Sequence, residues 1–181
     1  MLRQWKRIPP LVRIPLKYGI FGGVLSLAFV VTFYYLGKHP FLIPPFFDIR
    51  VFLIAIFLFF SLREVRDYFF EGIFYFWQGM AGSLVYLSCM TLIAALGLLA
   101  FGNYEPGFVS IYIEQGMAQI KSIPPESIEQ IGQRAVDEVL ESLPKTTLAQ
   151  MAVKYTSQTF AIGFFITIII SVILRRQPKT Q

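Results

Sequence analysis

The chain has few charged residues, and long stretches of it have none. Only 15% of its 181 residues are charged, whereas soluble domains carry about 25%. Three uncharged stretches of 20, 33 and 20 residues cover 18–37, 72–104 and 155–174. A helix needs about 20 mainly apolar residues to cross a bilayer. The sequence therefore excludes an ordinary soluble domain and predicts a multi-pass membrane protein.

Residues that support catalysis or metal binding are also scarce. The single cysteine, Cys89, has no partner for an intramolecular disulfide, and the single histidine, His39, cannot build a histidine metal cluster or a catalytic triad. The uncharged stretches also hold none of the ionisable side chains that transporters bury as proton relays. We therefore expect no enzyme activity, no cofactor and no metal site.

A fourth span is less obvious and is predicted over 45–65. Its charged residues Asp48 and Arg50 lie near one end, where they can reach the membrane interface. The predicted fold is all-α and polytopic, with four transmembrane helices and an exported amphipathic helical segment between helices 3 and 4. The predicted division is a basic segment 1–14, transmembrane helices 15–37, 45–65 and 73–101, an exported segment 103–146, a helix 147–174 leading into the fourth span, and a basic tail 175–181.

The distribution of charge predicts the orientation. Ten of the 16 basic residues lie in three segments: the N-terminal segment, the turn between spans two and three, and the tail. By the positive-inside rule, both termini are cytoplasmic. The stretch from Asn103 to Lys154 carries seven acids and four bases and is expected to face the periplasm. This topology explains the net charge of +5, so the expected partner is the lipid bilayer and not nucleic acid.

The exported segment contains an apolar stripe at helical spacing, formed by Ile128, Ile131, Ala135 and Val139 and continued by Leu143. The stripe either packs on the protein's own bundle or the membrane surface, or it is a docking face for another envelope protein. We favour the first interpretation, because any amphipathic helix must bury its apolar stripe somewhere.

Small residues predict close helix contacts. Gly19 and Gly23 form a GxxxG pattern in the first span, and Gly79 and Ser83 repeat the spacing in the third. Small residues four apart let membrane helices approach closely. Packing within the chain and formation of a homo-oligomer predict the same pattern, and packing within the chain is favoured.

Two polar clusters are candidate interfacial sites. Arg63 and Asp67 have the i, i+4 spacing of a supporting pair on a solvated helix end, with a partner or lipid-headgroup site as the alternative. Asp48 and Arg50 are two residues apart and would point to different sides of a helix. Each is therefore expected to find another partner, such as Lys38, His39 or a lipid phosphate.

The aromatic boundaries of the spans resemble a known family. The segments 62–68, 76–80, 144–147 and 173–176 are similar to the bacterial inner-membrane family called domain of unknown function 4199, which is found chiefly in Bacteroidota. The resemblance covers nearly the whole chain. It implies four spans with an exported helical segment between spans three and four, and it implies no reaction, ligand or catalytic residue.

The expected function is that of a non-catalytic accessory or scaffold subunit of a larger envelope complex. A small oligomeric transporter or channel is the alternative, and an enzyme acting on lipid headgroups comes third. The polar residues that would face a transport pathway are Gln78, Ser83, Tyr86, Gln158 and Thr159.

Overall fold

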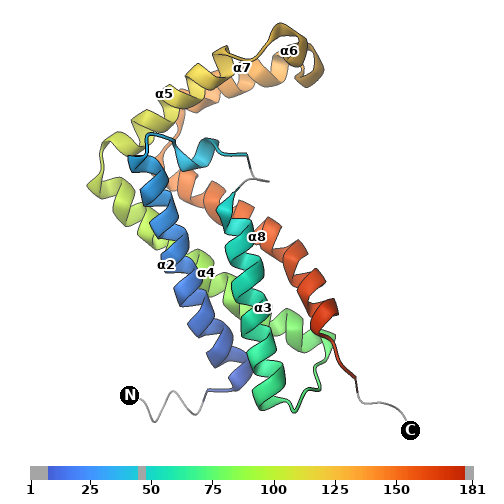
Figure 1. Ribbon diagram of the computed structural model, residues 1–181. Coiled ribbons are helices and arrows are strands. Elements are labelled where there is room, and N and C mark those ends of the chain that lie inside the picture. Colours follow the sequence, from blue (N-terminus) through green and yellow to red (C-terminus); the bar gives the residue numbers. More distant parts are fainter. Residues whose placement is uncertain (1–7, 45–47, 178–181) are drawn as a thin grey trace.

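Four long helices run side by side in the computed structural model, which describes residues 8–44 and 48–177 (Figure 1). Successive helices run in opposite directions, so α2 begins and α8 ends at the same end of the bundle. The four are α2 (Pro10–Tyr35), α3 (Ile49–Phe69), α4 (Phe76–Tyr104) and α8 (Leu148–Leu174). The described residues form helices and loops, apart from an isolated β-bridge between Phe74 and Arg176. The prediction of an all-α fold is confirmed.

Local sequence signals define where these helices begin and end. Pro10 occupies the first position of α2, where its missing N–H costs nothing, and Gly37 follows the end of α2 with a φ of +77°. Thr147 caps α8 by accepting a hydrogen bond from the backbone N–H of Gln150, whose side chain accepts one from Thr147 in return.

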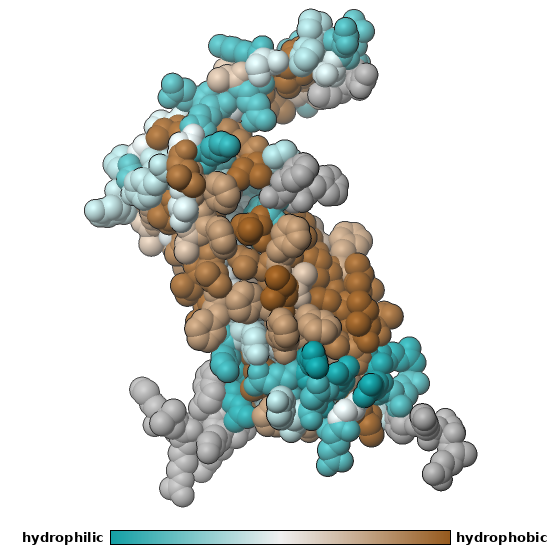
Figure 2. All heavy atoms as spheres, viewed as in Figure 1, coloured by the Kyte–Doolittle hydropathy of each residue, from teal (hydrophilic) through white to brown (hydrophobic). Residues whose placement is uncertain are grey.

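Three of the long helices are apolar enough to cross a membrane, namely α2, α4 and α8. Figure 2 shows a hydrophobic band across the visible face of the bundle, with hydrophilic residues at both ends. Helix α3 is long enough, with 21 residues, but every 18-residue stretch of it contains at least four charged residues. Three apolar spans define a multi-pass membrane protein.

The small residues named above lie where helices touch. A Cβ atom on Gly19 would stand 2.9 Å from the carbonyl oxygen of Tyr86, and one on Gly23 would stand 2.8 Å from that of Met90. Both contacts join α2 to α4. A Cβ on Gly79 would lie 2.6 Å from the hydroxyl of Ser171 on α8. Ser83 is fully buried and donates to the Gly79 carbonyl at 2.7 Å.

Apolar side chains form two cores at different levels of the bundle. The lower core lies where α3 packs against its neighbours, and the upper core lies where α4 and α8 meet the helices that follow α4. Fully buried members of the lower core are Ile54, Leu58, Leu62, Val65, Phe74, Tyr86 and Met90. Members of the upper core include Leu98, Phe108, Tyr112, Leu143, Met151 and Tyr155.

A helical arm projects from the end of the bundle opposite the start of α2 and the end of α8 (Figure 1). We call the two ends of the bundle the arm end and the basic end. The arm consists of α5 (Gly107–Lys121), α6 (Pro125–Ile131) and α7 (Gln133–Ser142), and the 3-10 turn η3 (Leu143–Lys145) connects it to α8.

The single apolar stripe predicted along 128–143 is wrong. Gly132 adopts a φ of +93°, a conformation that side chains other than glycine rarely adopt, and it divides the segment into α6 and α7. On α7, Ala135 and Val139 are exposed, while Val136 is buried. Leu143 packs against Gly116 of α5 at the base of the arm. Ile128 is partly buried, and the side chain of Ile131 lies outside the described residues.

Candidate functional site

Asp48 and Arg50 form a buried ion pair at the arm end of α3. Asp48 is 7% exposed and Arg50 9% exposed. The Arg50 Nε donates to Asp48 Oδ2 at 2.6 Å, the Nη2 group also contacts Oδ2, and the backbone N–H of Arg50 donates to Oδ1 at 2.9 Å. The expectation that these residues find other partners is wrong. Asp48 has extended backbone angles as the N-cap of α3, so helical spacing does not apply and its carboxylate turns back over the first turn.

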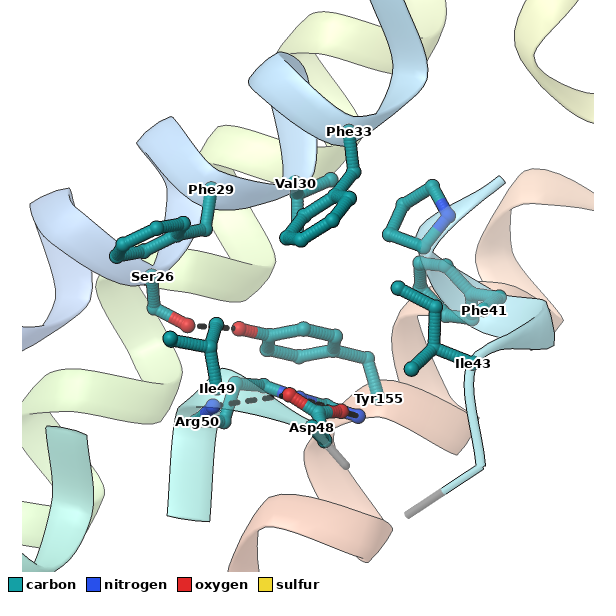
Figure 3. Close-up of a pocket in the computed structure, with 11 residues that line it drawn as sticks. Ser26, Phe29, Val30, Phe33, Phe41, Ile43, Asp48, Ile49, Arg50 and Tyr155 are labelled. Atoms are coloured by element: carbon teal, nitrogen blue, oxygen red, sulfur yellow. Dashed lines mark hydrogen bonds and ion pairs between the residues drawn. The ribbon is translucent and has the colours of Figure 1, made fainter. Parts of the chain in front are cut away.

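Two further side chains fix the position of the Arg50 guanidinium. Its central carbon lies 4.4 Å from the centre of the Tyr155 ring, a cation–π contact, and its Nη1 donates to Thr159 Oγ1 at 3.3 Å. The Tyr155 hydroxyl lies 2.5 Å from the Ser26 hydroxyl (Figure 3). These contacts join the start of α3 to α8 and to the middle of α2.

A small cavity of about 30 Å³ adjoins the pair, large enough for about one water molecule. Figure 3 shows Ser26, Tyr155, Asp48 and Arg50 along its polar side. Aromatic and aliphatic residues of α2 and the η1 turn (Pro40–Leu42) form the rest of the lining. Because a buried charged pair is stable only with its remaining polar groups satisfied, the contacts of Arg50 with Thr159 and Tyr155 favour a fixed structural pair.

His39 lies beside this cluster and connects the loop after α2 to the arm. Its ring packs 4.7 Å from Phe108 and 5.2 Å from Tyr112, measured between ring centres. Its Nδ1 accepts from the backbone N–H of Phe41, and its Nε2 lies 3.2 Å from the Phe108 carbonyl oxygen. Both contacts suit the neutral ring with the proton on Nε2. Burial lowers the pKa of His39 to about 4, although the Phe108 carbonyl opposes this shift.

The second predicted cluster lies at the basic end of the same helix. Asp67 accepts from Arg63 at 3.3 Å, as the spacing suggests, and from Arg66 at 2.7 Å. The neighbouring Glu64 accepts from the hydroxyl of Tyr18 on α2 at 2.8 Å. The fold therefore keeps this cluster apart from Asp48 and Arg50, because the two occupy opposite ends of α3.

The polar residues suggested for a transport pathway mostly bond to backbone atoms. Gln78 accepts from the N–H of Tyr75 at the start of α4, Tyr86 donates to the Leu53 carbonyl, and Thr159 donates to the Tyr155 carbonyl. These three side chains are buried, as is that of Ser83, while Gln158 lines a groove at the arm end. Four other buried hydroxyls have no hydrogen-bond partner among the described residues: Ser61, Thr91, Thr167 and Ser171.

Sequence reasoning did not identify Tyr155 or Ser26 as members of this cluster. A usable signal was the i, i+4 spacing of Tyr155 and Thr159, which puts two polar side chains on one face of α8. Ser26 and Tyr155 are 129 residues apart, so no spacing in the sequence indicates that they touch. That contact depends on how α2 and α8 pack.

The long apolar helices and the buried polar cluster at one end of their bundle define a multi-pass, all-α membrane protein. Residues 17–176 match the family described as Protein of unknown function (DUF4199). The chain therefore belongs to this family, as its aromatic boundaries indicated. No curated protein and no solved structure matched the chain. The match says nothing about the source organism, so an origin in Bacteroidota stays a prediction.

Proposed function

We propose that the protein is a non-catalytic accessory or scaffold subunit of a larger complex in the bacterial inner membrane, and that its arm binds the partner. The observation that carries this proposal is the arm itself. It extends well beyond the bundle that supports it (Figure 1). On α7, Val136 is the buried residue, and the exposed side chains include the apolar Ala135 and Val139.

The proposal includes α3 as a fourth span. Its buried face packs in the lower core, while Phe52, Ile56 and Phe60 on its other face are 50% to 60% exposed. Large apolar side chains at this spacing suit contact with lipid better than contact with water. The charges of α3 lie near its ends, where interfacial residues are tolerated.

The charges at the two ends support an orientation with the arm in the periplasm. The basic end carries Arg13, Lys17, Arg63, Arg66, Arg175 and Arg176. The positive-inside rule favours a cytoplasmic position for this end, with both termini in the cytoplasm and residues 103–146 in the periplasm.

Packing within the bundle favours a scaffold over the alternative of a transporter. Of the side chains proposed to line a pathway, Ser83, Tyr86 and Thr159 donate to backbone carbonyls and Gln78 caps α4, whereas Gln158 lines the groove at the arm end. Large apolar side chains such as Leu58, Leu62 and Met90 are fully buried in the same bundle. Hydroxyls that bond within their own helices are typical of structural positions in membrane helices.

The test is purification of the tagged protein from its native membrane in mild detergent, followed by mass spectrometry. We expect other membrane proteins at near-equal stoichiometry, and we expect Ala135→Glu with Val139→Glu to release them. Arg134→Glu is the matched control, because it changes an exposed charge on the same helix. A pure homo-oligomer, or a partner that both variants retain, would contradict the proposal.

A further inference from the structure

A polar groove of about 350 Å³ opens at the arm end, between the η1 turn, α5 and α8. Its polar lining comes from Arg50, Tyr112, Gln119, Lys154 and Gln158, while residues 40–44 supply an apolar wall. This volume is at the lower end of the range for small-ligand sites, and an apolar wall with a few convergent polar groups is typical of them. The groove shares Arg50 with the buried ion pair but is much larger than the cavity beside it.

The groove has an excess of positive charge. The charge of Arg50 is balanced by Asp48. Lys154 donates to the Tyr112 hydroxyl at 3.3 Å, and among the described residues no carboxylate forms an ion pair with it. An ammonium group has three donors, so two remain for a ligand. The amides of Gln119 and Gln158 add uncharged donors and acceptors around the same space.

Lys154 also marks a defined level in the membrane. It is the last charged residue before the uncharged stretch 155–174 of α8. At about 1.5 Å per residue these 20 residues span roughly 30 Å, the thickness of the hydrocarbon core. If α8 crosses the bilayer, this length is expected to put the Lys154 ammonium at the edge of the hydrocarbon, where the phosphate groups of one leaflet begin.

We propose that this groove binds a phosphate group at the membrane surface, with Lys154 as its charge partner and Gln119 and Gln158 as hydrogen-bond donors. Lysine binds phosphate as a point charge through short, charge-assisted hydrogen bonds. A phospholipid headgroup and soluble phosphate supply the same chemistry, and the experiment distinguishes them. The site does not depend on docking by the arm, because Ala135 and Val139 are not part of the groove.

The experiment uses the full-length protein, delipidated in detergent, and measures binding of phosphatidylglycerol by native mass spectrometry. This lipid is suitable because its phosphate carries its only charge. Binding of inorganic phosphate is measured in a separate titration, from the shift that it causes in the unfolding temperature. We compare wild type with Lys154→Gln, with Lys154→Arg as the conservative variant and with Lys121→Gln as the control, which removes an exposed charge from the arm.

Loss of one charge-assisted hydrogen bond predicts about tenfold weaker binding of phosphatidylglycerol to Lys154→Gln, and unchanged binding to the other two variants. If Lys154→Gln instead weakens binding of inorganic phosphate but not of phosphatidylglycerol, the result would support the site and assign it to a soluble ligand. Equal affinity of wild type and Lys154→Gln for both probes would overturn the proposal. If Lys154→Gln does not fold, Gln158→Leu takes its place. We expect it to weaken binding by the same factor, and equal affinity of wild type and Gln158→Leu for both probes would again overturn the proposal.

Discussion

Arg50 is a buried cation whose charge is balanced by one carboxylate, that of Asp48. Removing one member of such a pair leaves the other charged and without its partner in a poorly solvated place. We expect Asp48→Asn or Arg50→Met alone to destabilise the protein by about 3 kcal/mol. The double variant should be closer to wild type, because it leaves no unpaired charge. Thermal unfolding in detergent of wild type, the two single variants and the double variant measures the coupling energy between Asp48 and Arg50.

The exposed pair of Arg63 and Asp67 on the same helix is the matched control for this cycle. Exposed pairs contribute less than about 1 kcal/mol, so Arg63→Gln and Asp67→Asn should each leave the unfolding temperature nearly unchanged. Equal losses at both pairs would show that the Asp48–Arg50 pair is no more important than a surface contact.

His39 makes stability dependent on pH. Its pKa is lowered from an ordinary value of 6.5 to about 4 in the folded protein, so the unfolded chain takes up a proton first as the pH falls. The stability contributed by the neutral ring is present above pH 6.5 and is lost between pH 6.5 and about pH 4, by about 3 kcal/mol in all. The rings of Tyr34 and Tyr112 pack on His39.

This pH dependence is checked by unfolding wild type and His39→Gln across the same range. The variant starts less stable at neutral pH, because it loses the contacts of the ring with Phe108, but its stability should fall less between pH 6.5 and 4. Parallel curves for the two proteins would assign the acid sensitivity to other groups.

At the scale of elements, the contact between α2 and α4 depends on two glycines. A Cβ on Gly23 would stand 2.8 Å from the Met90 carbonyl oxygen, and a backbone atom cannot move aside as a side-chain end can. Gly23→Leu should therefore cost about 3 kcal/mol, the upper part of the range for overpacking. Ala28→Leu is the control, because Ala28 is exposed on the same helix. Reduced stability of the monomer would assign the GxxxG pattern to packing within the chain, whereas loss of an oligomer with unchanged monomer stability would contradict this.

The sequence predicted those parts of the fold that local physics determines. Long uncharged stretches become α2, α4 and α8 because each helix satisfies its own backbone in lipid. Two failures have a conformational cause. Asp48 was treated as helical although it is an N-cap, and Gly132 was read as part of one helix although its backbone divides two. The contacts of Tyr155 and Ser26 depend on packing between distant segments, which no spacing in the sequence records.

At the scale of the whole molecule, the arm and the basic end must lie on opposite sides of the membrane if all four long helices cross it. Exposed positions at both ends allow a direct test in a Cys89→Ser background, which removes the single native cysteine. Glu129→Cys places a thiol on the arm, and Tyr68→Cys places one at the basic end of α3, where Tyr68 is 81% exposed.

We expect a membrane-impermeant maleimide to label Glu129→Cys on right-side-out spheroplasts and to label Tyr68→Cys only after lysis. This pattern follows because basic segments are retained in the cytoplasm during insertion, whereas the acidic arm is free to cross. The Cys89→Ser parent, which has no thiol, measures background labelling. Labelling of both positions before lysis would mean that α4, which lies between them in the chain, does not cross the membrane, and labelling of Tyr68→Cys alone would place the arm in the cytoplasm. The second result would remove the arm from the periplasm and from its proposed envelope partner, so topology is the first property to establish.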